Sequence, residues 1–98
     1  MELIKTLEEK KLTIALSGRL DTVTAPQLDA ELSGNLDDVT ELVLDFADLA
    51  YISSAGLRVL LSAQKVMNKQ GTLVVKNVCE EIQEVFNITG FSDILTIE

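Results

Sequence analysis

The stretch LVLDFADLAYISSAGLRVLLSAQKVMNKQG, residues 42–71, joins a strand pattern to a helix pattern. Residues 42–46 are almost continuously apolar, which is typical of a strand covered on both faces inside a parallel sheet. From Leu57 to Met67, apolar residues recur at helical spacing and form a wide stripe, so we expect a mostly buried helix. The polar remainder of that helix falls on one line and predicts a basic edge exposed to water: Arg58, Ser62, Lys65 and Lys69.

The start of this helix carries the strongest functional signal. Ser53 or Ser54 can cap the helix, because a serine oxygen accepts a hydrogen bond from a free N–H group of the first turn. The free N–H groups and the helix dipole also favour an anion at this end. The small residues Ala55 and Gly56 would let another protein approach closely. A serine here is therefore either a simple cap or a place for a phosphate, and both interpretations stay open.

The flanking sequence predicts the remaining elements. Alternating or apolar runs indicate further strands at 3–7, 12–17, 72–76 and 94–97. Two more helices are expected after the cap residues Thr24 and Asn77, because a glutamine or glutamate follows each of them three residues later, as in a capping box. Gly18 either ends the second strand or allows a bulge there.

The order of the elements, β-β-α-β-α-β-α-β, predicts how they pack. Strands joined through helices should be parallel, and the N-terminal hairpin adds an antiparallel edge strand. We therefore expect an α/β fold in one domain, residues 1–98, with a mostly parallel sheet of about five strands packed with helices. Loops that follow parallel strands gather at one edge of the sheet, so the loop at 20–24 and the Ser53-Ser54 loop should be neighbours.

Composition narrows the class of partner. The formal net charge is −8, from eight basic and sixteen acidic residues, which disfavours binding to nucleic acid or to an anionic membrane and favours a protein with a basic surface. No apolar run approaches the roughly 18 residues of a membrane span. Cys79 is the single cysteine; we interpret it as structural, and its lack of a disulfide partner fits a reducing cytoplasm.

The sequence also lacks the residues of common catalytic sites. It contains no histidine, which rules out a Ser-His-Asp triad and disfavours a hydrolase that would use Ser54. It has no phosphate loop or dinucleotide fingerprint, and a magnesium site would require Asp21, Asp45 and Asp48 to cluster. We therefore expect a protein that is not an enzyme and that binds no metal and no cofactor.

Several motifs resemble the STAS superfamily, and within it the bacterial anti-sigma-factor antagonists. The resemblance extends from about Leu3 to Ile97 and lies in these segments: Gly18-Arg19-Leu20-Asp21, Thr24-Ala25-Pro26, Asp45-Phe46, Asp48-Leu49, Tyr51-Ile52-Ser53-Ser54-Ala55-Gly56-Leu57 and Val85-Phe86-Asn87-Ile88-Thr89-Gly90-Phe91. It implies a cytoplasmic switch in transcription regulation. The unmodified protein binds an anti-sigma factor that is also a serine kinase, and thereby releases a sigma factor. The kinase then phosphorylates the antagonist, and a serine phosphatase restores it.

The resemblance places the phosphate on Ser54, with Ser53 as the alternative acceptor. Many phosphorylated members have an acidic residue where this chain has Ser53. An alternative within the same superfamily is therefore an interaction module without a phosphorylation switch, in a transport or signalling assembly. The residues expected to form the partner-binding surface are Asp21, Thr24, Ile52, Ser53, Ser54, Ala55, Gly56 and Arg58.

Overall fold

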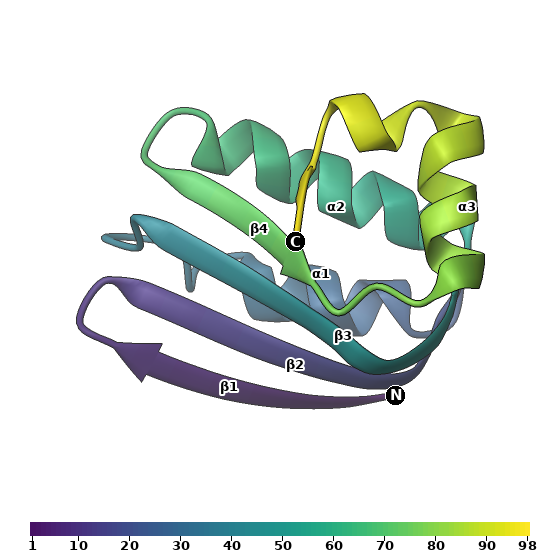
Figure 1. Ribbon diagram of the computed structural model, residues 1–98. Helices are drawn as coiled ribbons and strands as arrows, with labels where there is room; N and C mark the ends of the chain where they lie inside the picture. The colour runs from purple at the N-terminus through teal and green to yellow at the C-terminus, as the bar shows by residue number, and fades with distance from the viewer.

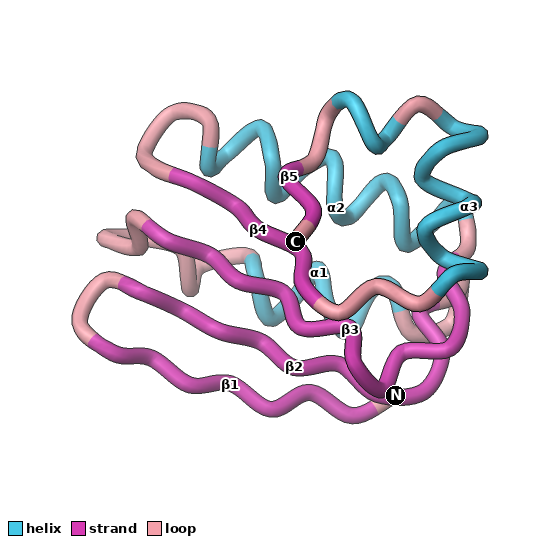
Figure 2. The backbone as a smooth tube through the Cα atoms, viewed as in Figure 1, coloured by secondary structure: helices cyan, strands magenta, loops and turns pink.

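The computed structural model describes all 98 residues and contains one five-stranded sheet with the order β1-β2-β3-β4-β5 (Figures 1 and 2). Strand β1 is antiparallel to β2, and every other neighbouring pair is parallel. The expected α/β fold with an antiparallel N-terminal edge strand is confirmed. The elements in chain order are β1 (Glu2–Glu8), β2 (Lys11–Leu20), α1 (Ala25–Leu32), β3 (Glu41–Ile52), α2 (Ser54–Met67), β4 (Thr72–Lys76), α3 (Glu80–Thr89), the 3-10 helix η1 (Phe91–Asp93) and β5 (Thr96–Ile97).

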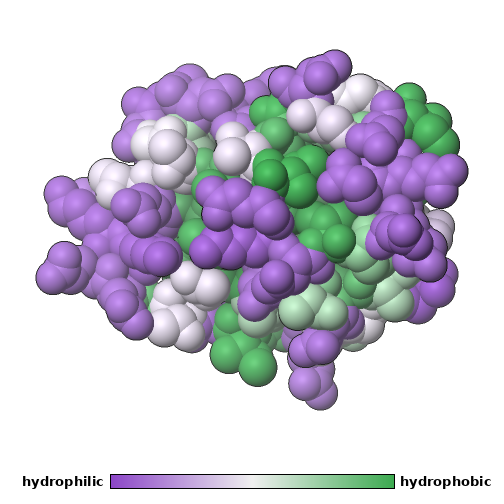
Figure 3. Space-filling model, viewed as in Figure 1, coloured by the Kyte–Doolittle hydropathy of each residue, from purple (hydrophilic) through white to green (hydrophobic).

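Helices α1 and α2 lie together behind the strands in Figure 1, and α3 lies at the end of the sheet where β3 and β4 finish. The face turned toward the viewer carries no helix along β1 to β4, so the expectation that β3 is covered on both faces is wrong. Val43 of β3 is nevertheless only 7% exposed, because Thr13 and Val74 flank it on the neighbouring strands. Figure 3 shows hydrophobic side chains along the middle of this open face, between hydrophilic ones.

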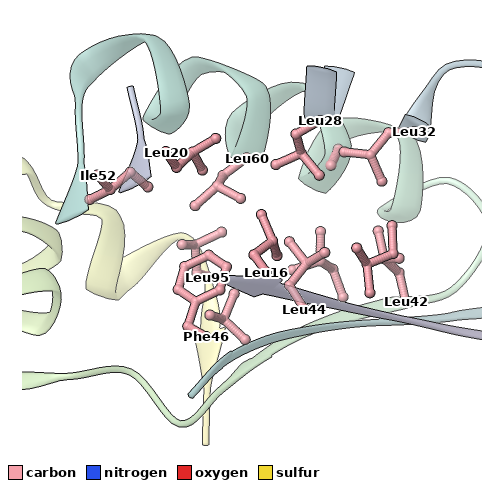
Figure 4. Packing of buried hydrophobic residues seen from close by; sticks show 14 of the residues in the cluster. Leu16, Leu20, Leu28, Leu32, Leu42, Leu44, Phe46, Ile52, Leu60 and Leu95 are labelled. Carbon is pink, nitrogen blue, oxygen red and sulfur yellow. The ribbon is translucent and has the colours of Figure 1, made fainter. Parts of the chain in front are cut away.

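The core lies between the sheet and the two helices behind it, and it contains a cluster of 23 buried hydrophobic residues. Figure 4 shows leucines of α1 and α2 facing side chains of β2 and β3: Leu28, Leu32 and Leu60 lie opposite Leu16, Leu42 and Leu44. Leu57, Leu60 and Met67 are buried, as the apolar stripe of α2 predicts. Val66 departs from that prediction because its side chain is 41% exposed, whereas the polar Gln64 is buried.

Strand β3 is much longer than the predicted run at 42–46, because it continues to Ile52. The extension pairs with the end of β2, where Gly18 lies opposite Leu49 and Leu20 lies opposite Ile52. Strand β2 likewise continues to Leu20, beyond the predicted run at 12–17 and into the expected loop. Two register shifts interrupt this pairing, one on each side of Gly18, whose φ is +94°. Of the two roles considered for Gly18, an irregularity within the strand is therefore the one observed.

Two predicted capping boxes are absent. The N-cap of α3 is Cys79, not Asn77. Asn77 adopts a left-handed conformation with φ +59°, and its side-chain amide donates a hydrogen bond to Asp45 Oδ1 at 3.0 Å. Asparagine tolerates this conformation better than most residues, so Asn77 forms the turn that follows β4. Thr24 occupies the N-cap position of α1 but makes no side-chain capping bond.

The turn after α2 depends on close packing. Helix α2 ends at Met67, so Lys69, which was expected on the exposed edge of this helix, lies beyond it. Gly71 follows the turn, and a Cβ atom there would lie 1.9 Å from the carbonyl oxygen of Thr40. That oxygen also accepts a hydrogen bond from Thr72 N at 2.9 Å. Only glycine fits at this position, and β4 thereby starts in close contact with the segment that leads into β3.

No helix of the protein is both long and apolar enough to cross a lipid bilayer.

Candidate partner-binding site at the start of helix α2

The loop after β2 and the start of α2 meet at one end of the sheet, as the topology predicts. The backbone N–H group of Ser53 donates a hydrogen bond to the carbonyl oxygen of Leu20 at 2.9 Å. Leu20 and Ile52 are both buried and lie close to α2 in Figure 4. The predicted site residues lie in the loop that follows Leu20 and in the segment around Ser53. The structure therefore brings these two segments together.

Gly56 allows this close contact. A Cβ atom at Gly56 would lie 2.8 Å from Ile52 Cγ1 and 2.8 Å from Leu20 Cγ, which is closer than real Cβ atoms approach other atoms. Gly56 therefore lets the first turn of α2 rest directly on the ends of β2 and β3. Gly56 and Ile52 are buried, so they support the exposed residues of the site and offer little surface to a partner.

The two serines have different roles. Ser53 is the N-cap of α2, is half-buried, and its Oγ accepts a long hydrogen bond of 3.5 Å from the backbone N–H of Gly56. Ser54 is the first residue of the helix, is exposed, and its hydroxyl makes no hydrogen bond within the chain. The first turn of α2 contains no acidic residue. The hydroxyl of Ser54 is thus free, at a helix end that favours negative charge.

Asp21 organises the neighbouring loop in place of the predicted Thr24 cap. Asp21 Oδ1 accepts hydrogen bonds from the backbone N–H groups of Val23 at 3.0 Å and Thr24 at 3.1 Å. Thr24 Oγ1 accepts from the Asp21 N–H at 2.8 Å. The hydroxyl hydrogen of Thr24 has two acceptors within reach, the carbonyl oxygen of Arg19 at 2.7 Å and Asp21 Oδ1 at 3.2 Å. An Asp side chain that bonds to the backbone two or three residues ahead is a common way to fix a turn. The loop is therefore held by reciprocal bonds between its first and last residues.

These bonds predict an abnormal titration of Asp21. Its pKa lies below the ordinary value, mainly because the Thr24 backbone N–H stabilises the carboxylate, with smaller contributions from the Thr24 hydroxyl, the Val23 N–H and the charge of Arg19. A lowered pKa in the folded state means that Asp21 stabilises the fold above the pKa of the unfolded chain. This contribution is lost as the pH falls through the folded-state pKa.

An NMR pH titration of the side-chain carboxyl carbons should place the pKa of Asp21 below the model-peptide value of about 3.9. Thr24→Val should raise that pKa part of the way back, because it removes the hydroxyl and keeps the backbone donor. Thr22→Val is the matched control, since Thr22 is exposed and makes no side-chain hydrogen bond. An equal rise in both variants would contradict the assigned hydrogen bonds.

Three exposed residues lie beside the predicted site residues but were not predicted from the sequence: Arg19, Tyr51 and Val23. The guanidinium of Arg19 lies 4.1 Å from the ring centroid of Tyr51, a cation–π contact between the ends of β2 and β3. Arg19 Nε also lies 3.9 Å from Asp21 Oδ2. Val23, at the tip of the loop, is 85% exposed. Arg19 falls within a motif quoted above, but only the strand register, which pairs Arg19 with Tyr51, reveals the contact.

The basic edge of α2 extends from this site. Arg58 and Lys65 are exposed, and neither forms an ion pair within the chain, whose two salt bridges join Lys5 to Glu31 and Arg19 to Asp21.

Carboxylates do not gather into a candidate metal site anywhere in the chain. Asp45 faces the N–H group of Ala47 and the amide of Asn77, away from the arrangement with Asp21 and Asp48 that a magnesium site would need.

The described site and fold coincide with a known domain type. The family model described as "Mlab, STAS domain" matches residues 5–96, a range that contains both site loops and all but the ends of the sheet. The chain belongs to the STAS domain family. Two curated relatives of this STAS domain are BtrV of Bordetella bronchiseptica, provisionally named an anti-sigma factor antagonist, and the anti-sigma-B factor antagonist of Bacillus subtilis.

BtrV is 40% identical over 88 residues, which cover 88% of this STAS domain and 76% of BtrV. The Bacillus subtilis protein is 31% identical over 90 residues, covering 91% of this chain and 83% of the relative. The anti-sigma factor antagonist SpoIIAA has been solved both unphosphorylated and phosphorylated, with TM-scores of 0.79 and 0.78 to this STAS domain at 20% identity. The two alignments each cover 99% of this chain, and 87% and 91% of the respective SpoIIAA chains.

Proposed function

We propose that this STAS domain is an anti-sigma-factor antagonist regulated by phosphorylation of Ser54. In its unmodified form it binds an anti-sigma factor through the surface around the start of α2, and the sigma factor is released. The anti-sigma factor acts as a kinase that transfers the γ-phosphoryl group of ATP to Ser54 Oγ, with release of ADP and the hydroxyl proton. A serine phosphatase reverses the modification in the cytoplasm. The domain itself supplies a binding surface and an acceptor hydroxyl, and is not an enzyme.

The observation that carries this proposal is the difference between the two serines. Ser53 is occupied as the helix cap, whereas the exposed Ser54 hydroxyl has no partner and lies at a helix end that accepts an anion. The relatives named as anti-sigma factor antagonists support the partner class. The existence of phosphorylated SpoIIAA supports a phosphate on this kind of fold. The acidic residue common before the acceptor serine is replaced here by a residue that performs the capping itself.

The proposal is tested by incubating the protein with ATP, magnesium and candidate anti-sigma kinases encoded in the same genome, followed by mapping of the phosphate by mass spectrometry. We expect a single phosphate on Ser54. The Ser54→Ala variant should bind the kinase and remain unmodified, whereas Ser53→Ala should still accept phosphate. Mapping of the phosphate to Ser53 would transfer the switch to that residue. Tight binding without any phosphorylation would instead favour a STAS interaction module that has no such switch.

The exposed basic edge gives a separate prediction about association. If Arg58 contacts an acidic patch of the partner, Arg58→Glu should lower the association rate constant, and wild-type binding should weaken with added salt. Stopped-flow or surface-based kinetics at several salt concentrations measure both effects. Lys65→Glu is the control, because it makes the same charge reversal in the last turn of α2, far from Ser54. If Arg58→Glu associates like wild type, Arg58 is not part of the interface.

A further inference from the structure

Arg58 follows Ser54 by four residues on helix α2, which places the two side chains one above the other on the same face. Both residues are exposed, and Arg58 forms no ion pair in the unmodified protein. Helix α2 contains no aspartate or glutamate at all, so no acidic residue of the helix competes for the guanidinium. A phosphate on Ser54 would be the first negative charge within one turn of Arg58 on this helix.

The direction of the pair is the favourable one. The Cα–Cβ bonds of an α-helix tilt toward its N-terminus, so a long side chain at position i+4 leans back over the residue at position i. Pairs with the negative group N-terminal to the positive group at this spacing stabilise helices more than the reverse order. The guanidinium group also offers a planar set of donors that matches the oxygens of a phosphate.

Another cation at this end of the sheet, Arg19, is already occupied. Arg19 stacks on the ring of Tyr51 at 4.1 Å and lies 3.9 Å from a carboxylate oxygen of Asp21. To reach a phosphate on Ser54, Arg19 would have to give up these contacts. Arg58 would lose only its hydration, so it is the better partner for the phosphate.

We propose that a phosphate on Ser54 captures the guanidinium of Arg58. This inference rests on the proposed function, which puts the phosphate on Ser54, and it assigns a second part to the switch. In the unmodified protein Arg58 is free to meet an acidic partner surface. After phosphorylation the same guanidinium is held by the phosphate within the chain. The modification thus removes a favourable contact from the interface in addition to placing a negative charge there.

The test uses the full chain with phosphoserine installed at position 54 during translation, so that it needs no kinase and remains informative if another serine is the natural acceptor. A ³¹P NMR titration measures the second pKa of the phosphate, which is about 6 in the absence of special contacts. We expect Arg58→Gln to raise this pKa by about 0.3 units, the equivalent of ~0.4 kcal/mol for a pair at this spacing. Arg58→Lys should give a smaller rise, because it keeps the charge and loses the planar group.

Two control variants separate this pair from general electrostatics. Arg19→Gln removes a second cation near the site, and Lys65→Gln removes a charge from the far end of α2. Both should change the pKa of the phosphate less than Arg58→Gln does. The proposal is overturned if Arg58→Gln leaves this pKa unchanged within error, or if either control raises it as much.

Discussion

Replacing Ser54 with aspartate is expected to weaken binding of the anti-sigma factor about a hundredfold while the domain stays folded. Ser54 is exposed at the first position of α2, where the helix dipole favours a negative charge by about 0.3–1 kcal/mol. The charge therefore does little harm to the isolated domain. In the complex, a carboxylate enclosed without a partner costs several kcal/mol, and a loss of about 3 kcal/mol corresponds to roughly a hundredfold in affinity.

Titration calorimetry with the purified anti-sigma factor measures the affinity, and thermal unfolding followed by circular dichroism measures the stability. Ser62→Asp is the matched control, because Ser62 is an exposed serine on the same helix two turns further on. It introduces the same charge away from the helix start, four residues after Arg58, and should lose less affinity than Ser54→Asp. Binding of Ser54→Asp with wild-type affinity would contradict a switch based on charge at Ser54.

Leu60→Ala is expected to lower the free energy of unfolding by about 2–5 kcal/mol, because it removes a buried side chain and leaves a cavity. Leu60 is fully buried in the middle of α2, and Figure 4 shows it between the helix and the strands. Alanine has the highest helix propensity, so the loss reports packing and not weakening of the helix. A domain with roughly 5–15 kcal/mol of total stability would lose a large part of it.

Chemical denaturation of the wild type and the variant gives this difference directly. Val66→Ala serves as the control on the same helix, because the side chain of Val66 is 41% exposed and little burial is lost there. We expect Val66→Ala to lower the free energy of unfolding much less than Leu60→Ala does, by about 1 kcal/mol or less. Equal losses in the two variants would show that the buried position of Leu60 contributes no more to stability than the partly exposed position of Val66.

The order of the elements and the core face of α2 could be predicted because both depend on periodicity within one segment. The length of β3 could not, because residues 47–52 continue as a strand only through pairing with residues 17–20 of β2. No local pattern in either segment reveals that register, which is interrupted twice. The open face of the sheet escaped prediction for a similar reason: Val43 is shielded by neighbouring strands, and its sequence pattern resembles that of a residue covered by a helix.

That the two loops of the candidate site are neighbours was predictable from topology, because loops after parallel strands lie at one edge of the sheet. The separate roles of the residues in this candidate site were not predictable. The sequence offers Ser53 and Ser54 as equivalent caps, and only the backbone geometry shows that Ser53 holds the N-cap position. Thr24 was expected to cap α1, but Asp21 holds the loop because its carboxylate reaches two backbone N–H groups at once.

The strictly sequential order of the strands bears on how the chain folds. Leu12 pairs with Leu42, and Leu42 with Leu73, so each of these two parallel steps closes a segment of about thirty residues. The steps from β1 to β2 and from β4 to β5 close shorter segments. A nascent chain can therefore complete its hairpin, add β3 with α1, and then add β4 with α2, in the order in which these parts leave the ribosome. On this route the Ser53–Ser54 segment is positioned as soon as β3 has docked on β2, before β4 and β5 join the sheet.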